Sequence, residues 1–168
     1  MSISDMIVVM KEGVVQQIGK PQAVYDDPIN LFVSKFLGTP PINVFGGVVK
    51  GGRLFIGDES VLDVPGASDG EVWAGIRPEG FIPDASGPLT CKLRGVEVMG
   101  RDISVVCAHD KCEATQIRAI ISAENAIDEG SPTVRFSLKP RKVHLFDRAT
   151  EARIRFDTGE KGAARHGR

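Results

Sequence analysis

The sequence predicts a mainly β protein, and three observations support this. From Asn43 onward, short β segments alternate with glycines at a spacing typical of a small barrel or sandwich. The 168 residues include 19 Gly and 10 Pro, which indicates many turns. Hydrophobic residues make up 42% and charged residues 26% of the chain, the balance of a globular protein that is long enough to bury a core.

The first part of the chain predicts a β-hairpin. Residues 6–10 form an unbroken apolar run, which is typical of a strand buried on both faces. Residues 11–13 then form a turn, and residues 14–18 form the second strand. Because only five residues precede the run, its sheet partners must come from later in the chain, from another copy or from a part not present here. Since an exposed apolar edge promotes association, we expect residues 1–18 to pair with another copy or to be poorly ordered.

Two short helices are expected next. Pro21 suits the first turn of a helix that runs through Tyr25, because its missing N–H has no helical partner at that position anyway. Asp27 is the expected N-cap of a second helix, residues 28–36, which carries an apolar stripe at helical spacing. The sequence Thr39-Pro40-Pro41 prevents the helix from continuing and predicts a domain boundary.

The rest of the chain predicts a series of short strands, at residues 44–49, 53–56, 71–76, 89–98, 103–108, 112–121, 133–138, 143–146 and 153–156. Short helical turns are expected near residues 77–81 and 122–126. Residues 158–168 contain no large apolar side chain, so they predict a disordered tail.

Composition excludes several classes of protein. The 21 Lys and Arg residues balance the 22 Asp and Glu residues, and aromatic residues are sparse, so the sequence predicts no nucleic-acid partner. No apolar stretch is long enough for a membrane helix, and no signal peptide is recognisable, so we expect a cytoplasmic chain. Three cysteines, an odd count without regular spacing, favour reduced thiols over a disulfide framework.

One segment approaches the pattern of a phosphate-binding P-loop but fails it. Five residues separate Gly13 from Gly19, where the pattern requires four, and Pro21 follows Lys20 in place of the hydroxyl residue that binds Mg²⁺. Proline also removes a backbone donor from the phosphate cradle. We therefore expect no P-loop, and neither a nucleophile elbow nor a metalloprotease helix motif occurs, so no catalytic residue is predicted.

A weak metal-site candidate lies at Cys107, His109 and Cys112. In a hairpin that turns at His109 and Asp110, the two cysteines would face each other with side chains about 5 Å apart. A structural zinc site usually needs four ligands, and the other Cys and His residues are distant in the sequence. Two half-buried thiols across a hairpin are therefore the favoured interpretation, with no metal bound, and a small metal or thiol protein is kept as an alternative.

The most distinctive segment is Trp73-Ala-Gly-Ile-Arg-Pro-Glu79. A strand is expected to end at Ile76, with Pro78 at the first position of a helical turn and Glu79 at its positive end. Arg77 could then reach a carboxylate or a main-chain carbonyl near the strand end. A corner stabilised by local charge and a binding role are both compatible with this pattern.

The order of these motifs resembles a known family. The blocks "SISDMIVVMKEGVVQQIGKPQAVYDDPINLFVSKFLGTPPIN", "GIRPE" and "KVHLFD" are similar to the C-terminal third of the ATP-hydrolysing subunits of ABC importers for sugars and glycerol phosphate, the maltose-importer type. The resemblance covers residues 2–157. It departs at Gly80, where the family more often has a larger residue, and in the cysteine-containing hairpin. The resemblance implies a regulatory or interface motif formed by Gly75, Ile76, Arg77, Pro78, Glu79, His144, Leu145, Phe146 and Asp147.

The resemblance also implies a domain organisation. Residues 1–38 would be the C-terminal remnant of an ABC nucleotide-binding domain, with its hairpin and two helices left over from an α/β fold. Residues 39–157 would be an OB-like regulatory domain of the TOBE type, and residues 158–168 a disordered tail. The sheet partners of residues 5–18, the phosphate-binding loop and the residues that hold Mg²⁺ would lie upstream, so the chain is expected to be a fragment.

The function that this resemblance implies is a scaffold. The regulatory domain would pack against its twin in a homodimer and keep two ATPases together, which makes their ATP-driven association effectively intramolecular. The parent subunit would bind ATP and Mg²⁺, contact membrane permease subunits at the inner membrane and, in some members, dock an inhibitory regulator. The chain by itself would need no cofactor and hydrolyse no ATP. A free-standing OB-type module that binds a small ligand or an oligonucleotide remains a second alternative.

Overall fold

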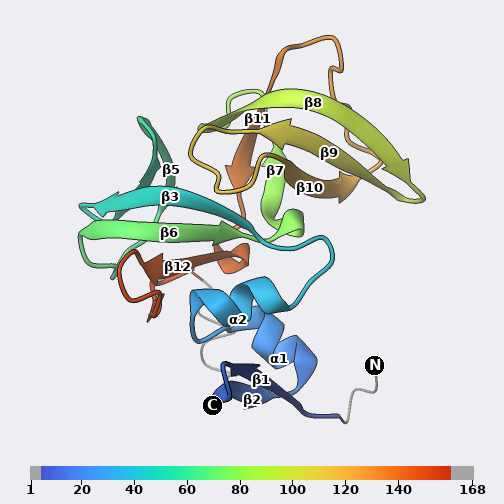
Figure 1. Cartoon of the computed structure of the whole chain (residues 1–168). Helices are drawn as coiled ribbons and strands as arrows, with labels where there is room; N and C mark the ends of the chain where they lie inside the picture. Colours follow the sequence, from blue (N-terminus) through green and yellow to red (C-terminus); the bar gives the residue numbers. More distant parts are fainter. Residues whose placement is uncertain (1–4, 160–168) are drawn as a thin grey trace.

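The computed structural model describes residues 5–159 (Figure 1). We call residues 5–38 the N-terminal segment and residues 39–157 the β unit. The N-terminal segment lies at one end of the molecule and contains β1 (Ile7–Lys11), β2 (Val14–Gly19), α1 (Pro21–Asp26) and α2 (Leu31–Phe36). The expectations for residues 1–4 and 160–168 lie outside the described residues.

The predicted N-terminal hairpin is confirmed. Strands β1 and β2 pair antiparallel, with Val8 opposite Ile18 and a bulge after Val9. The turn between them has positive φ at both Glu12 (51°) and Gly13 (79°). Two consecutive residues of positive φ match the right-handed twist of the strands, which is why a Gly is needed in this tight turn.

The two faces of the hairpin differ, and burial on both faces, as expected from the sequence, is not found within this chain. Val9 on the inner face is fully buried and packs with Val24 of α1 and Val33 of α2. On the outer face, apolar side chains are about half exposed. They are Val8, Met10, Val15 and Ile18, with Met6 and Val14 beside them.

The helices form where expected, with one correction. Helix α1 begins at Pro21, as predicted, but Asp27 is not the N-cap of α2. That cap is Asn30, whose side-chain oxygen accepts the N–H of Val33 at 2.9 Å. Because α1 continues to Asp26 and residues 28–29 are not helical, α2 begins three residues later than expected and Asp27 ends α1 instead.

The β unit begins and ends in a six-stranded antiparallel sheet with the order β13-β12-β6-β3-β4-β5. Its strands are β3 (Asn43–Lys50), β4 (Arg53–Ile56), β5 (Glu59–Asp63), β6 (Gly70–Ile76), β12 (Val143–Asp147) and β13 (Arg153–Ile154). Between β6 and β12 the chain leaves this sheet, builds a second one and returns. Two segments that are about 70 residues apart thereby become neighbouring strands.

The second sheet has five strands in the order β10-β9-β8-β11-β7. They are β7 (Phe81–Pro83), β8 (Leu89–Met99), β9 (Asp102–Ala108), β10 (Ile117–Ser122) and β11 (Thr133–Leu138). The sheet curls until β10 lies close to β7, so the barrel is nearly closed and OB-like (Figure 1). The 3-10 turns η1 (Pro78–Gly80) and η2 (Pro140–Lys142) connect the two sheets.

One hydrophobic core is shared by the two sheets. Phe45 and Leu54 enter it from the six-stranded sheet, and Leu89, Ile117 and Phe136 enter it from the five-stranded sheet, all of them fully buried. Phe81 packs edge-on against Phe136 with ring centroids 5.1 Å apart. The mainly β, OB-like class predicted for this part of the chain is therefore confirmed.

Several strand predictions need correction. Strands β5 and β7 were not predicted, because they are short and lack a clear alternation of apolar residues. The strand expected at 112–121 begins only at Ile117, and Cys112 makes an isolated bridge to Phe45 instead. Residues 122–126 contain a turn rather than a helical segment, whereas the helical turn after β6 is confirmed as η1.

Candidate functional site

The two motifs singled out in the sequence are joined by the sheet. Strands β6 and β12 pair so that Gly75 lies opposite His144 and Ile76 opposite Val143. The N–H of Arg77 also donates to the carbonyl of Lys142 at 3.0 Å. The nine predicted motif residues therefore lie together, at the paired strands β6 and β12 and the turn after β6. Glu79 and Asp147 are partly exposed, and the other seven residues are buried.

Arg77 holds the ends of both helices in the N-terminal segment. Its side chain is 1% exposed, and its Nη1 donates to the carbonyls of Ser34 at 2.9 Å and Leu37 at 3.1 Å. Its Nη2 donates to the carbonyl of Tyr25 at 2.7 Å. The last carbonyls of a helix lack helical partners and carry partial negative charge, so a buried guanidinium is well suited to satisfy them. The predicted contact to main-chain carbonyls is confirmed, but the carbonyls belong to α1 and α2.

Tyr25 and Glu79 extend this contact towards the surface. The Arg77 guanidinium lies over the Tyr25 ring, 3.9 Å from its centroid. The Tyr25 hydroxyl donates to the two carboxylate oxygens of Glu79 at 2.8 and 3.0 Å, and Lys142 Nζ lies 3.1 Å from Glu79. Burial, followed by the bond to Glu79, raises the pKa of Tyr25. Burial alone would raise the pKa of Glu79, but hydrogen bonds, including those from Tyr25 and Lys142, hold it below its ordinary value.

A second set of contacts ties the loop between α1 and α2 to β13. Asp27 Oδ1 accepts from Arg153 Nη1 at 2.9 Å and from Arg155 Nη1 at 2.6 Å. The main chain contributes as well, because the N–H of Arg153 donates to the carbonyl of Ile29 at 3.1 Å. Burial opposes ionisation of Asp27, but the hydrogen bonds and charges of the two arginines outweigh it and lower the pKa of the carboxyl.

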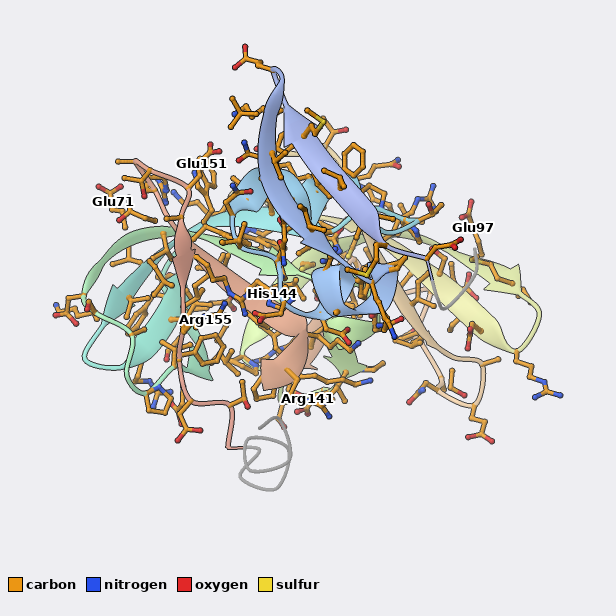
Figure 2. All side chains as sticks on the ribbon, turned by 90° about the horizontal axis from the view of Figure 1, so that it is seen from below. Glu71, Glu97, Arg141, His144, Glu151 and Arg155 are labelled. Atoms are coloured by element: carbon orange, nitrogen blue, oxygen red, sulfur yellow. The ribbon has the colours of Figure 1, made fainter. Side chains whose placement is uncertain are left out.

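His144 is buried between these two sets of contacts, where β12 passes under the N-terminal segment (Figure 2). Burial, followed by the positive charges of Arg153 and Arg77, lowers the pKa of His144 to about 3. The imidazole is therefore neutral near pH 7. Its Nδ1 has no hydrogen-bond partner among the described residues.

Apolar contacts complete the attachment. Leu31 of α2 packs on the outer face of the six-stranded sheet with Ile42, Val44 and Phe146. Gly75 provides space for this contact, because a Cβ at this position would lie 2.7 Å from Ile42 Cδ1. We call the whole contact between the N-terminal segment and the β unit, centred on Arg77, Tyr25, Glu79, His144 and Asp27, the joint.

Gly80, where the sequence departs from the family pattern, lies at the edge of the joint. A Cβ at Gly80 would come within 2.8 Å of Lys142 Cβ. The residue is buried, and its N–H donates to the carbonyl of Arg77 at 2.8 Å. The close approach of η2 to η1 in this chain therefore requires a residue without a side chain at this position.

The cysteine cluster does not have the expected geometry. Strands β9 and β10 pair Cys107 with Ile117, so Cys107 and Cys112 do not face each other across a hairpin. Cys107 is fully buried in the core, and its hydrogen bond with Cys91 together with burial raises the pKa of the Cys91 thiol. His109 lies edge-on to Phe45, with centroids 5.6 Å apart. Within residues 5–159, no group of three Cys, His, Asp or Glu side chains has the geometry of a metal site.

Comparison with known proteins gives relatives of one kind. The chain is 32% identical over 151 residues to the sn-glycerol-3-phosphate import ATP-binding protein UgpC of Jannaschia sp. (strain CCS1), covering 88% of the chain and 41% of the relative. It is 33% identical over 172 residues to the oligosaccharides import ATP-binding protein MsmX of Bacillus subtilis, covering 92% of the chain and 46% of the relative. The chain is homologous to the ATP-binding subunits of ABC importers.

A third relative is of the same kind, and the chain matches only part of each relative. The ABC transporter ATP-binding protein YcjV of Escherichia coli is 32% identical over 170 residues. The chain spans less than half the length of these curated relatives. No family model matches it. In the described part of this ABC importer homologue, no helix is both long and apolar enough to cross a membrane.

Sequence reasoning missed part of the joint. It selected Arg77 and His144, but not Tyr25, Asp27 or Lys142 as their partners. The contacts of Arg77 to the N-terminal segment join residues 40 to 52 positions apart in the chain, beyond the range of any helical or strand periodicity. One local signal was available, since Lys142 is the first residue of the block "KVHLFD", but it did not indicate a partner.

Proposed function

We propose that this chain is the regulatory and dimerisation part of the ATP-binding subunit of an ABC importer for a sugar or glycerol phosphate. The observation that carries the proposal is the similarity over 88–92% of the chain to import ATP-binding proteins for glycerol-3-phosphate and oligosaccharides. The OB-like β unit supports it, because a β unit of this kind offers a rigid surface without needing catalytic residues.

The proposal divides the chain at the boundary between the N-terminal segment and the β unit. Residues 1–38 are the end of a nucleotide-binding domain, and residues 39–157 are the regulatory domain. The outer face of the hairpin supports this division, because six apolar side chains there are 49–62% exposed. A two-stranded sheet is marginal on its own and needs a further layer or further strands. We infer that the rest of a nucleotide-binding domain covers this face in the whole subunit.

In this proposal the joint holds the N-terminal segment and the β unit in a fixed arrangement and takes no part in a chemical reaction. Arg77 fixes the helix ends to the β unit, and Asp27 fixes the intervening loop, so the two parts move as one body. Two regulatory domains that remain in contact would then hold two nucleotide-binding domains at a high effective concentration. Of the nine motif residues, Arg77, Glu79, His144 and Phe146 act through this internal contact.

The proposal also assigns the nucleotide and the membrane partners to other parts of the whole subunit and of the importer. ATP and Mg²⁺ would be bound by the upstream domain, and permease subunits would be contacted from the cytoplasmic side of the inner membrane. The chain by itself is proposed to hydrolyse no ATP, because its sequence contains no G-x-x-x-x-G-K-[ST] segment. A phosphate-release assay with ATP and Mg²⁺ tests this, and a rate that scales with protein concentration through repeated purification would contradict it.

The dimer is tested by light scattering on the purified chain. To separate it from association through the hairpin, the experiment uses a variant with Val8→Thr, Met10→Thr and Ile18→Thr, which replaces three of the six exposed apolar side chains of the outer hairpin face with polar ones. We expect this variant to remain dimeric at low micromolar concentration. A variant that is monomeric while the wild-type chain is dimeric would show that only the exposed hairpin causes association, and would refute the proposed dimerisation role.

A further inference from the structure

The end of the β8–β9 hairpin carries an exposed apolar projection. Val98 is 79% exposed and Met99 is 52% exposed, and both stand at the end of β8, which extends beyond the rest of the barrel (Figure 1). Exposed apolar residues that are scattered singly are common, but these two are adjacent at the end of a projecting hairpin.

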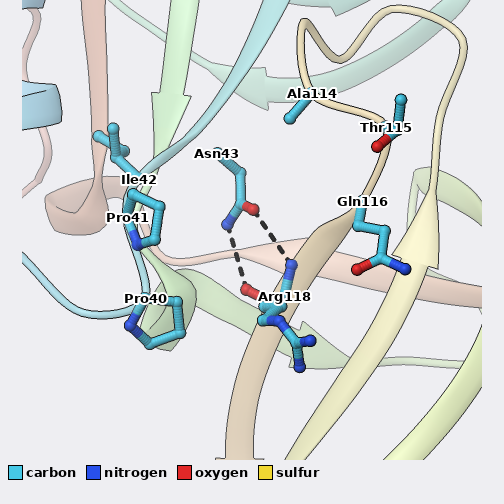
Figure 3. Close-up of a pocket in the computed structure, with 8 residues that line it drawn as sticks. All are labelled: Pro40, Pro41, Ile42, Asn43, Ala114, Thr115, Gln116 and Arg118. Atoms are coloured by element: carbon cyan, nitrogen blue, oxygen red, sulfur yellow. Dashed lines mark hydrogen bonds between the residues drawn. The ribbon is translucent and has the colours of Figure 1, made fainter.

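A hollow of about 590 Å³ lies directly beside this projection. Its lining combines the projection, the linker before β3 and the outer face of β9 and β10, in the residues Thr39, Pro40, Glu97, Val98, Met99, Ser104 and Arg118. A second hollow of about 240 Å³ continues it on the other side of Pro40 and Arg118 (Figure 3). The surface therefore has an apolar projection and an adjacent depression of side-chain size.

The polar groups of the hollow are held in place and carry both signs of charge. Arg118 Nη1 lies 2.7 Å from Glu97 Oε1 and 3.4 Å from the hydroxyl of the buried Ser104. The main chain of Arg118 is fixed by the side chain of Asn43, which accepts its N–H at 3.1 Å and donates to its carbonyl at 3.2 Å (Figure 3). The Glu97–Arg118 pair has no net charge, so it offers little to a strongly charged ligand.

We propose that this surface, formed by Pro40, Glu97, Val98, Met99 and Arg118, is where a second copy of the chain docks about a two-fold axis. A two-fold contact uses the same patch on both partners, so the patch must complement itself. A projection beside a depression meets this requirement in shape, and one guanidinium beside one carboxylate meets it in charge. The projection of each copy enters the hollow of the other, and Glu97 of each copy faces Arg118 of its partner.

This inference rests on the proposed dimerisation role and specifies its surface. Glu97 and Arg155 lie on opposite sides of the molecule (Figure 2), and the patch meets the joint only at the linker that follows α2, where Thr39 and Pro40 line the hollow. Contact here therefore leaves the N-terminal segment free to carry the rest of a subunit. Because all the residues that line the hollow belong to the β unit, the contact does not depend on the exposed face of the β1–β2 hairpin.

The test is a charge exchange between two variants. Glu97→Arg gives a patch with two positive groups, and Arg118→Glu gives one with two negative groups. Each variant alone is expected to dimerise at least about tenfold more weakly than the wild-type chain, because like charges meet across the axis. An equimolar mixture is expected to recover a dimer of wild-type affinity, since every facing pair is then of opposite sign. Sedimentation velocity of each sample measures the dissociation constants.

Asp63→Arg is the matched control, because it disrupts another exposed ion pair, Arg53 with Asp63 at 3.0 Å, on the distant β4–β5 hairpin. It should leave the dimer unchanged. If both single variants dimerise as strongly as the wild-type chain, or if the mixture does not recover, this docking surface is wrong while the dimerisation role stands. If the wild-type chain is monomeric at every concentration, the proposed dimerisation role itself fails.

Discussion

Arg77 shows how one buried side chain attaches a whole segment. Three main-chain carbonyls from two helices converge on its guanidinium, and the Tyr25 ring covers it. The sequence predicted a polar role for Arg77 at the end of a strand, because Pro78 and Glu79 define the turn that follows. The sequence did not predict the partners, because they are set by how α1 and α2 pack on the sheet.

Replacing Arg77 with Met should destabilise the chain by about 3 kcal/mol, because it leaves buried carbonyls without a donor. Arg77→Lys should cost less but still loosen the helices, since one ammonium cannot reach all three carbonyls. Urea denaturation measures the free energy of unfolding, and hydrogen exchange at residues 21–37 reports local opening. The control is Arg53→Lys on the exposed β4–β5 hairpin. Equal exchange at residues 21–37 in all three variants would contradict the role of Arg77.

His144 should make the fold sensitive to acid. Its pKa is about 3 when folded and near 6.5 in the unfolded chain, so between these values the unfolded state binds more protons. The contribution of the neutral, buried His144 to the free energy of unfolding is fully present above pH 6.5. It is lost as the pH falls towards 3, by up to about 1.4 kcal/mol per pH unit. Urea denaturation at pH 7 and pH 5 measures the loss.

The comparison that isolates His144 is with His144→Leu. Asp27 and Glu79 have lowered pKa values and also lose stabilising ionisation in acid, but they are present in both proteins. His109, whose pKa is lowered by burial, is likewise common to both. The wild-type chain should therefore lose about 2 kcal/mol more than the variant between pH 7 and pH 5. Equal losses would show that His144 is solvated or partnered in the folded chain.

At the scale of the elements, local patterns predicted most of the structure. The β1–β2 hairpin, the start of α1 at Pro21 and the strand that ends at Ile76 follow from turn residues and apolar runs. Short edge elements did not follow from them. Strand β7 has three residues, and the segment before β10 bridges to β3 through Cys112 and Phe45, a tertiary contact.

The two faces of the β1–β2 hairpin should respond differently to substitution. Val9→Ala on the inner face should cost about 2 kcal/mol, because it leaves a cavity against Val24 and Val33. Val8→Ala on the outer face should change the free energy of unfolding by less than about 0.5 kcal/mol. Thermal and urea denaturation measure both. A similar cost at the two positions would mean that the outer face is covered in solution.

Gly87 should be the most restrictive glycine in the β unit. A Cβ there would lie 2.4 Å from the carbonyl carbon of Phe136, in the backbone of β11, which cannot move aside like a side chain. Gly87→Ala should cost about 2–3 kcal/mol. Gly95→Ala is the matched control, because no atom lies within 4 Å of a Cβ there, and it should be neutral or slightly stabilising. A fully stable Gly87→Ala variant would show that the loop between β7 and β8 is not packed against β11 as described.

At the scale of the whole molecule, the sequence predicted the class of fold and the family, and the structure adds the attachment between the two parts. The apolar run at residues 6–10 predicted a strand that needs cover, and the exposed outer face of the β1–β2 hairpin shows where that cover is missing within the chain. The sequence could not place the joint, because Tyr25 lies 54 positions from Glu79 in the chain and Asp27 lies 126 positions from Arg153.

The measurement that most directly tests the central claim is the molar mass of the hairpin-face variant across a dilution series, by light scattering. A monomer has a mass of 18.1 kDa. If the β unit is a dimerisation domain, the mass should stay near twice this value down to low micromolar concentration and fall smoothly towards it on further dilution. A mass that equals the monomer at every concentration, in a variant that remains folded by circular dichroism, would contradict the account.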